Sequence, residues 1–190
     1  YLDSIQTLSY TVEAKDPYTR GHSDRVSEYS VLIGKKLGLS DDDLKTLRVG
    51  GLFHDIGKIG IPDSILLKES KLTDDEYSEI KSHPSIGAHI LCNAEVFKDI
   101  IPIVKHHHER YDGRGYPGQL KGEDIPYFAR IAAVADSFDA MTSKRTYRNS
   151  LDISIVRSEI EKNLGTQFDP KLGKIFIDII DNEYDKIKEI

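Results

Sequence analysis

Histidine and aspartate residues recur along this sequence in an arrangement that suits metal binding. His54 and Asp55 are adjacent. Such a pair places a ring nitrogen and a carboxylate at nearly the same point, and that carboxylate can bridge two metal ions. By itself the pair more often has a capping or surface role. The accompanying candidates are His22, His83, the run His106–His108 followed by Glu109, and Asp136.

Asp136 lies in an otherwise apolar segment, among residues such as Ile131, Val134 and Phe138. Burying a carboxylate in such surroundings is costly unless the charge is paired or coordinated. We therefore expect Asp136 to have a partner.

The cysteine content limits which atoms can hold a metal. The single cysteine, Cys92, cannot form an internal disulfide or a thiolate cluster. Metal ligands would therefore be nitrogen and oxygen atoms, and 7 histidines are available. Cys92 itself is expected to be a small core residue.

The elements that position these residues are predicted to be helices, because apolar residues recur at helical spacing almost everywhere. We find no convincing alternating strand pattern, so the predicted fold class is all-α. Residues typical of helix starts are Ser40 before three aspartates, Thr73 with Glu76, Asp152, and Asp169-Pro170. The helix that carries His54 is expected to end in a loop from residue 57 to about 72. A second loop is expected over 112–122, and a helix carrying Asp136 over 125 to about 143.

Length and composition limit the class of protein. A chain of 190 residues is typical of one domain, so we expect a single domain over 1–190. With 38% apolar and 31% charged residues it is not a disordered tail or a coiled-coil rod. The net charge of −6 does not favour binding to a nucleic acid polymer, whose phosphates are also negative.

The sequence also indicates where the domain would work. No apolar run reaches the roughly 18 residues of a membrane span, and no signal peptide is recognisable. We expect a cytoplasmic domain without membrane contact of its own. Because the chain begins at Tyr1 rather than Met, we expect it to be part of a longer regulatory protein.

Five segments resemble the motifs of the HD-GYP family of the HD phosphohydrolase superfamily, in order and at the expected separations. They are YTRGHSDRV at 18–26, HDIGKIGIP at 54–62, HPSIGAHIL at 83–91, HHERYDGRGYPG at 107–118 and ADSFDAMTSKRTYR at 135–148. Five co-linear motifs are more specific than any one of them. The resemblance implies an HD-domain helical bundle with two functional loops, and members of that family are cyclic di-GMP phosphodiesterases.

The same resemblance implies a set of metal ligands with Asp55 as the bridging, catalytic carboxylate. The implied ligands are His22, His54, Asp55, His83, His107, His108 and Asp136. This set suits two divalent ions, Fe or Mn. Two such ions, roughly 3.5–4 Å apart, can activate a hydroxide and stabilise an in-line displacement at phosphorus. Family members with a third metal carry a glutamate where this chain has Tyr18, so we expect two ions.

Four residues are implied to contact the substrate. Lys58 would hold a phosphate oxygen or assist the leaving group as a catalytic residue; the alternative is a surface lysine. Arg145 and Arg148 match basic positions that bind phosphates, for which guanidinium geometry is well suited, and the alternative is solvated charge after a helix. Tyr116, in the name-giving Gly-Tyr-Pro triplet, would stack on guanine or anchor its own loop.

Three further residues lie near the seven implied ligands in the sequence. Asp139 follows Asp136 by three residues and would pair with Lys58 or serve as an outer ligand. His89 and His106 are expected not to be ligands.

The leading hypothesis is therefore hydrolysis of cyclic di-GMP to pGpG, with a second cut to GMP left open. One alternative keeps the metal site but changes the substrate to another cyclic dinucleotide, such as a hybrid cyclic GMP-AMP, or to a mononucleotide. Another is a non-catalytic receptor for cyclic di-GMP. Degenerate family members usually lack ligands and this chain lacks none of the seven, which argues against a receptor.

The resemblance also implies partners in signal transduction. We expect an N-terminal sensor or receiver domain in the full protein. The first helix, to about residue 15, would be a signalling connector or a dimer element, and a homodimer is one expected state.

Overall fold

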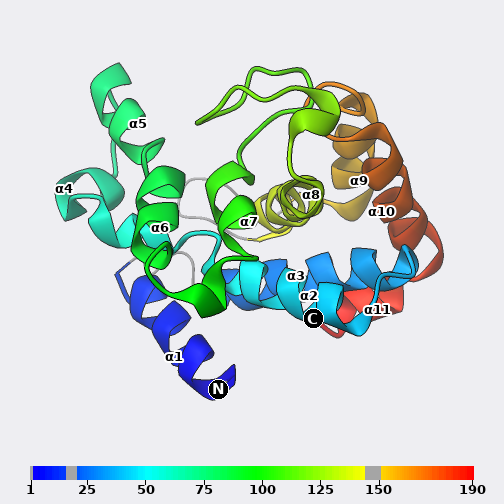
Figure 1. Cartoon of the computed structure of the whole chain (residues 1–190). Coiled ribbons are helices and arrows are strands. Elements are labelled where there is room, and N and C mark those ends of the chain that lie inside the picture. The colour runs from blue at the N-terminus through cyan, green and yellow to red at the C-terminus, as the bar shows by residue number, and fades with distance from the viewer. Residues whose placement is uncertain (1, 16–20, 144–150) are drawn as a thin grey trace.

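A computed structural model describes residues 2–15, 21–143 and 151–190. The helices are α1 (Leu2–Glu13), α2 (His22–Lys36), α3 (Asp41–Phe53), α4 (Asp63–Leu66), α5 (Asp74–Ile80), α6 (His83–Leu91), α7 (Ile101–His106), α8 (Tyr127–Thr142), α9 (Ile153–Lys162), α10 (Pro170–Asn182) and α11 (Tyr184–Lys188) (Figure 1). Short 3₁₀ segments are η2 (Ile56–Gly60), η3 (Glu95–Phe97) and η4 (Gly122–Asp124). Over these ranges there is no strand, only an isolated bridge between Leu164 and Phe168. The predicted all-α fold is confirmed, and none of the described helices is long and apolar enough to cross a membrane.

The helix starts predicted from capping residues are confirmed. The capping side chains are Ser40 of α3, Thr73 of α5, Asp152 of α9 and Asp169 of α10, and each accepts a hydrogen bond from a backbone N–H of the first turn. Thr73 and Glu76 form a reciprocal capping box. These side chains satisfy first-turn amides that have no partner within the helix.

The loop predicted from residue 57 to about 72 is partly wrong. The 3₁₀ segment η2 follows Asp55 directly, and the short helix α4 lies within the predicted loop. Helix α4 begins directly after Pro62, whose φ of −59° already suits a helix start. The second predicted loop is confirmed over 112–121 and ends in η4, and the helix predicted from 125 is α8, which begins two residues later, after Pro126.

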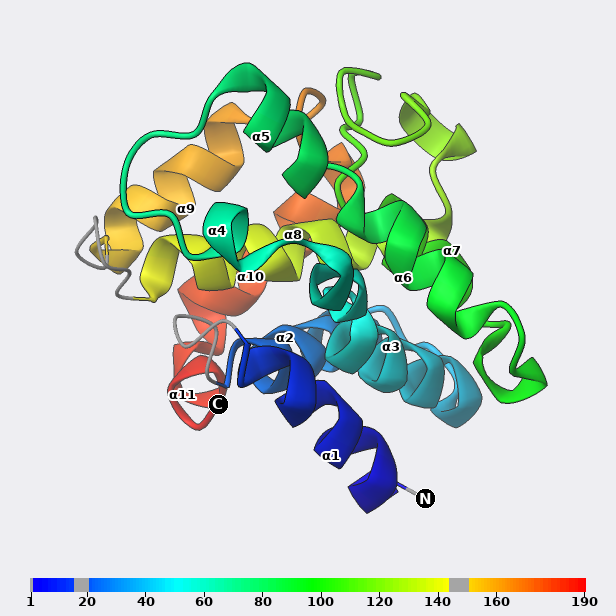
Figure 2. The same cartoon turned by 90° about the vertical axis from the view of Figure 1, so that its left-hand side faces the viewer.

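Helix α8 lies in the middle of the molecule (Figure 2). It packs against α2 on one side and against α7 on another, while α3 packs against α2 and α7. The larger apolar cluster includes the rings of Tyr29, Phe138 and Phe176, whose centroids lie 4.8–6.4 Å apart. A smaller cluster joins α3, α6 and α7 through residues such as Phe53, Leu91 and Val104. This packing brings α2, α3 and α7 against α8, and it places α6 against α7 and η2.

Two glycines permit the close approaches that this convergence requires. A Cβ added at Gly57 would lie 1.8 Å from the carbonyl oxygen of His83 and 2.5 Å from the nitrogen of Gly87, on α6. A Cβ added at Gly51 would lie 2.6 Å from the Cα of Ser27, on α2. Glycine therefore brings the segment after α3 against α6, and α3 itself against α2.

Candidate metal centre

The structure brings the seven expected metal ligands together in two groups. The four-residue group contains Asp55, His83, His107 and His108, and the three-residue group contains His22, His54 and Asp136. Within each group the ligand atoms lie within 4.8 Å of one another. Motifs that are far apart in the sequence thus meet at one place.

Helix ends position most of these side chains. His22 is the first residue of α2 and His83 the first of α6, while His54 and His107 cap the C-terminal ends of α3 and α7. Asp136 projects from the middle of α8. The convergence of helix ends on α8 therefore builds the site.

Asp55 lies between the two groups and faces each with a different oxygen. Its Oδ1 is 3.2 Å from His83 Nε2 and 3.8 Å from His107 Nε2. Its Oδ2 is 3.5 Å from His54 Nε2 and 3.8 Å from His22 Nε2. A carboxylate placed in this way can contribute one oxygen to each of two cations.

Three of the histidine rings are oriented by backbone carbonyls close by in the sequence. The Nδ1 atoms of His54, His83 and His107 lie 2.7–2.9 Å from the carbonyl oxygens of Gly51, Ile80 and Val104, three residues earlier in each case. A ring that donates through Nδ1 presents the lone pair of Nε2, as metal-binding histidines commonly do. Among the residues that the structure describes, none completes a hydrogen bond to the buried Nε2 atoms of His83 and His107. Buried polar atoms rarely lack partners, so these two atoms fit metal ligation.

His22 is oriented by a side chain instead. Its Nδ1 lies 2.7 Å from Asp139 Oδ2, and Arg25 holds the same carboxylate through Nε, 2.5 Å from Oδ1. Of the two expectations for Asp139, the pairing with Lys58 is wrong, because Asp139 is one turn beyond Asp136 on α8 and faces α2, where Arg25 lies. Its contact with His22 leaves the other expectation, an outer ligand, as a prediction. Asp139 therefore contacts a candidate ligand from behind.

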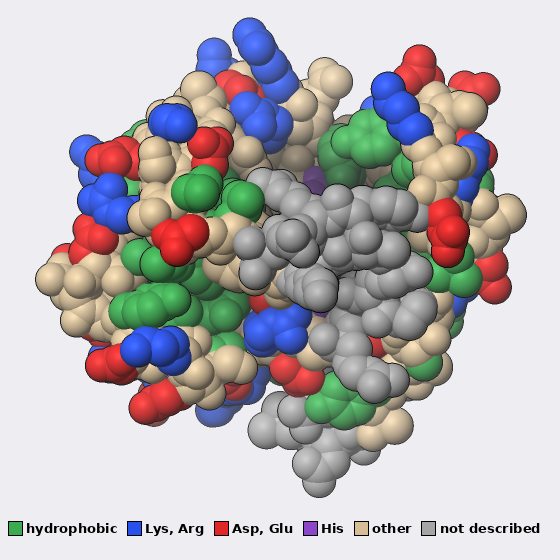
Figure 3. Space-filling model, turned by 180° about the vertical axis from the view of Figure 1, so that it is seen from behind, with side chains coloured by type: hydrophobic (Ala, Val, Ile, Leu, Met, Phe, Trp, Pro, Cys, Tyr) green, Lys and Arg blue, Asp and Glu red, His purple; other side chains and the backbone are tan. Residues whose placement is uncertain are grey.

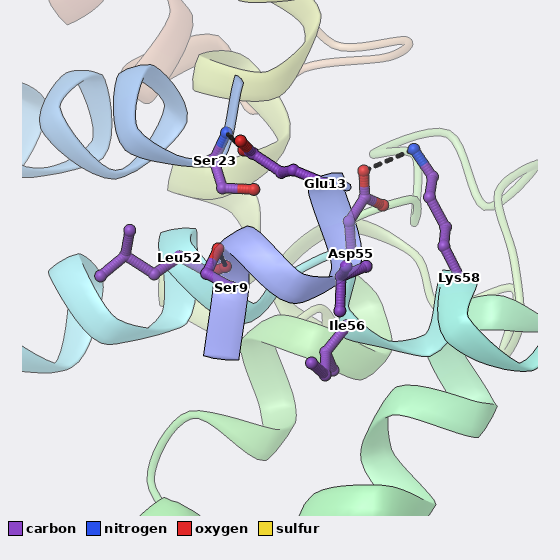
Figure 4. A pocket seen from close by; sticks show the side chains of 8 residues that line it. Ser9, Glu13, Ser23, Leu52, Asp55, Ile56 and Lys58 are labelled. Carbon is purple, nitrogen blue, oxygen red and sulfur yellow. Dashed lines mark hydrogen bonds and ion pairs between the residues drawn. The ribbon is translucent and has the colours of Figure 1, made fainter. Parts of the chain in front are cut away.

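Lys58 forms an ion pair with Asp55. Its Nζ is 2.6 Å from Asp55 Oδ2 (Figure 4). Burial acts to raise the pKa of Asp55, but the charge of Lys58 outweighs it and holds that pKa well below its usual range. Lys58 is thus placed at the candidate centre.

Burial and neighbouring charges set the protonation of the histidines. Burial lowers the pKa of His54 and His107, and lowers that of His108 to about 4. Burial also acts to lower the pKa of His22, but hydrogen bonds to Asp136 and Asp139 outweigh it and raise the pKa to about 9. Without a cation, the carboxylates therefore hold a proton on His22, whereas the other three rings are neutral and ready to bind a metal.

A cleft of about 370 Å³ opens over both groups. Its lining includes the candidate ligands His22, Asp55, His108 and Asp136 and the side chains of Lys58, Tyr77, Arg110, Tyr116, Ser137 and Gln167. Histidine atoms are visible on the face shown in Figure 3. The Tyr116 ring stacks on His108, with centroids 4.8 Å apart, and burial raises its pKa, so the phenol stays neutral.

Four of these cleft residues were not predicted. Arg110 and Ser137 lie close to expected ligands in the sequence, which is the only signal that pointed to them. Tyr77 and Gln167 come from α5 and from the turn before α10, and only the fold brings them here. Gln167 spans one side of the cleft, since its Oε1 lies 3.4 Å from Arg110 Nη1 and its Nε2 donates to Ser137 Oγ at 3.1 Å.

Other expectations have mixed outcomes. Tyr18, Arg145 and Arg148 lie outside the described residues. His89 and His106 belong to neither ligand group. The prediction that Cys92 is a core residue is wrong, because it is exposed at the end of α6.

Comparison with known families and sequences gives strong matches. The HD domain family matches residues 6–172. A 3′3′-cGAMP-specific phosphodiesterase of Vibrio cholerae is 38% identical over 191 residues, which cover 98% of this chain and 42% of that protein. A cyclic di-GMP phosphodiesterase response regulator of Xanthomonas campestris is 39% identical over 171 residues, with coverages of 89% and 45%. The chain therefore spans less than half the length of these two curated relatives.

The fold also matches a solved structure. A cyclic GMP-AMP-specific phosphodiesterase of Vibrio cholerae superposes with a TM-score of 0.74 at 23% identity, covering 95% of this chain and 48% of that one. At this identity the likeness establishes the shared helical fold.

Proposed function

The chain belongs to the HD domain family, and we propose that it is a metal-dependent phosphodiesterase that hydrolyses cyclic di-GMP to linear pGpG. The resemblance of its motifs to the HD-GYP members of that family is confirmed. Relatives named cyclic di-GMP phosphodiesterase match most of this chain, which supports the proposed substrate.

The placement of Asp55 carries the proposal. One of its oxygens faces His83 and His107, and the other faces His22 and His54. The four-residue group would hold one cation and the three-residue group a second, with Asp55 shared. When bound, two cations supply a water of lowered pKa and offset the charge that develops on the phosphoryl oxygens. Five imidazoles and two carboxylates suit Fe or Mn.

The remaining cleft residues have separate tasks in this proposal. Lys58 stabilises the ionised form of Asp55 and lines the cleft, where its ammonium group can contact a phosphate oxygen or the oxygen of the leaving group. Tyr116 offers a ring to a base at the mouth of the cleft. Gln167 has an amide that can hydrogen-bond a base edge or a ribose hydroxyl. Arg145 and Arg148 are proposed to bind substrate phosphates on the basis of the motif alone.

A second candidate keeps this site and takes 3′3′-cyclic GMP-AMP as substrate. The observation that favours it is that a relative named for that substrate is 38% identical, against 39% for one named for cyclic di-GMP. Offering both dinucleotides in one reaction separates the two candidates, because the ratio of initial rates equals the ratio of their kcat/KM values at equal concentration.

The decisive experiment combines metal analysis with product chromatography. Protein loaded anaerobically with Fe²⁺ or Mn²⁺ is expected to hold two ions per chain and to release pGpG from cyclic di-GMP; GMP would reveal a second cut. His54→Ala should lose metal and activity together. His89→Ala is the matched control, an exposed histidine outside both ligand groups. Two bound ions with tight binding of cyclic di-GMP and no turnover would instead identify a receptor.

The role of the domain in a longer protein is also a proposal. The relatives are more than twice as long as the matched region, which supports a regulated domain attached to a sensor or receiver. We propose that 1–190 is one cytoplasmic HD-GYP domain, with α1 as its connector or as an element of a homodimer.

A further inference from the structure

We infer that Glu13, the last residue of α1, is a positioning residue for His22. The inference rests on the proposed metal centre. Glu13 is only 7% exposed, although it carries a carboxylate. Its Oε2 accepts from the Gly21 N–H at 2.9 Å and its Oε1 from the Ser23 N–H at 3.0 Å, as Figure 4 shows for Ser23.

The start of α2 requires a partner of this kind. The N-cap residue is Gly21, which adopts a left-handed conformation with φ of 69° and has no side chain to accept from the first-turn amides. Unpaired amides at a helix start carry partial positive charge, so a carboxylate is the strongest acceptor for them. Glu13 supplies that acceptor from a different helix.

The two hydrogen bonds hold the backbone on either side of His22. The ring is then fixed by Asp139 at Nδ1, while Nε2 lies 3.3 Å from Asp136 Oδ1 and 3.2 Å from His54 Nε2. The position of Nε2 in the three-residue group therefore depends on where Glu13 lies.

Two other side chains of this region attach α1 to the segments that carry His54 and Asp55. Ser9 Oγ donates to the Leu52 carbonyl at 2.8 Å, two residues before His54. Lys15 Nζ, just after α1, donates to the carbonyls of Ile59 and Ile61 at 2.9 and 2.6 Å. These hydrogen bonds hold α1, and with it the Glu13 carboxylate, in a fixed position relative to His54 and Asp55.

The test separates positioning from stability with a matched control. Asp169 is also 7% exposed and also accepts from two backbone amides at a helix start. Its carboxylate pairs in addition with Arg130 at the start of α8, but it contacts no candidate ligand, and its helix, α10, carries none. Metal-free wild type, Glu13→Ala, Glu13→Gln and Asp169→Ala are each titrated with Mn²⁺ by calorimetry, and their thermal unfolding is measured.

We expect wild type to bind two Mn²⁺ ions. Glu13→Ala should weaken one site by about 10- to 100-fold, the usual effect of losing a residue that orients a metal ligand, and leave the other unchanged. Glu13→Gln keeps one acceptor oxygen and should lose less affinity at the same site. Asp169→Ala should unfold at a lower temperature with both affinities intact.

Several outcomes would overturn the inference. Wild-type affinities at both sites in Glu13→Ala would do so, as would an equal loss at both. If Glu13→Ala does not fold, unchanged affinities in Glu13→Gln have the same meaning. Wild type that binds fewer than two ions would overturn the proposed function and this inference together, whereas the other outcomes overturn the inference alone.

Discussion

The two groups of candidate ligands are held in place in different ways. In the four-residue group, His83 and His107 are oriented by backbone carbonyls three residues earlier in the chain, that of Ile80 at the end of α5 and that of Val104 in α7. In the three-residue group, His54 is oriented in the same local way by Gly51, but His22 is oriented by Asp139, which lies 117 residues away, and its backbone is held by Glu13. The local hydrogen bonds form within a short stretch of chain, at the end of a helix or in the turn between α5 and α6, while the position of His22 requires α1, α2 and α8 to be packed together.

This difference implies that the two groups respond differently to perturbation. Hydrogen bonds to a local carbonyl persist as long as the helix end persists. Hydrogen bonds between distant side chains are lost whenever the elements shift. Changes elsewhere in the fold can therefore weaken the three-residue group without weakening the four-residue group.

The largest expected effect is a loss of metal affinity at both groups at once. Asp55→Asn changes the one residue that faces both, so it should weaken Mn²⁺ binding at both sites by more than the ~100-fold that the loss of an orienting residue causes. Calorimetric titration of the metal-free protein measures this, and Asp75→Asn, an exposed aspartate on α5, is the control. Loss of only one site would contradict a shared carboxylate.

A pair of glycine substitutions should perturb the groups separately. Gly57→Ala places a methyl against the His83 backbone, and Gly51→Ala places one against Ser27 on α2. Overpacking of this kind should lower the free energy of unfolding by about 1–3 kcal/mol in each variant, as denaturant unfolding measures. Gly57→Ala should weaken metal binding at the four-residue group and Gly51→Ala at the three-residue group. Each glycine substitution is also combined with His22→Ala or with His83→Ala, each of which removes one candidate ligand, so that the site still affected can be assigned to a group. The same pattern of affinities in both glycine variants would contradict independence of the groups.

The sequence predicted features that depend on neighbouring residues and missed those that depend on contacts between distant elements. Helix starts such as Thr73 with Glu76 depend on neighbouring residues, so a local pattern predicts them. The motifs named the seven candidate ligands, which the structure brings together. The partner of Asp139 and the place of Gln167 in the cleft depend on packing between distant elements, which no local pattern contains. Cys92 was misplaced for a similar reason, because residue type alone does not say which face of α6 is covered.

Asp139→Asn tests the side-chain anchor directly. The amide keeps the size of the side chain but loses the charge that His22 and Arg25 share. We expect metal affinity to fall by about 10- to 100-fold at the three-residue group and to stay unchanged at the four-residue group. The control is Asp178→Asn, which removes an exposed ion pair with Lys36. Equal loss at both sites would indicate general loosening of the fold.

The smallest expected effect concerns a cleft residue that belongs to neither group. Gln167→Ala removes the amide between Arg110 and Ser137 without touching a candidate ligand. One lost hydrogen bond to the substrate corresponds to about a 2- to 10-fold rise in KM, with both metal affinities unchanged. Steady-state hydrolysis of cyclic di-GMP measures this, with Thr166→Ala as the exposed neighbouring control. A fall in kcat accompanied by loss of metal would show that Gln167 supports the three-residue group through Ser137, next to Asp136, and would extend the side-chain anchoring of that group to a third element.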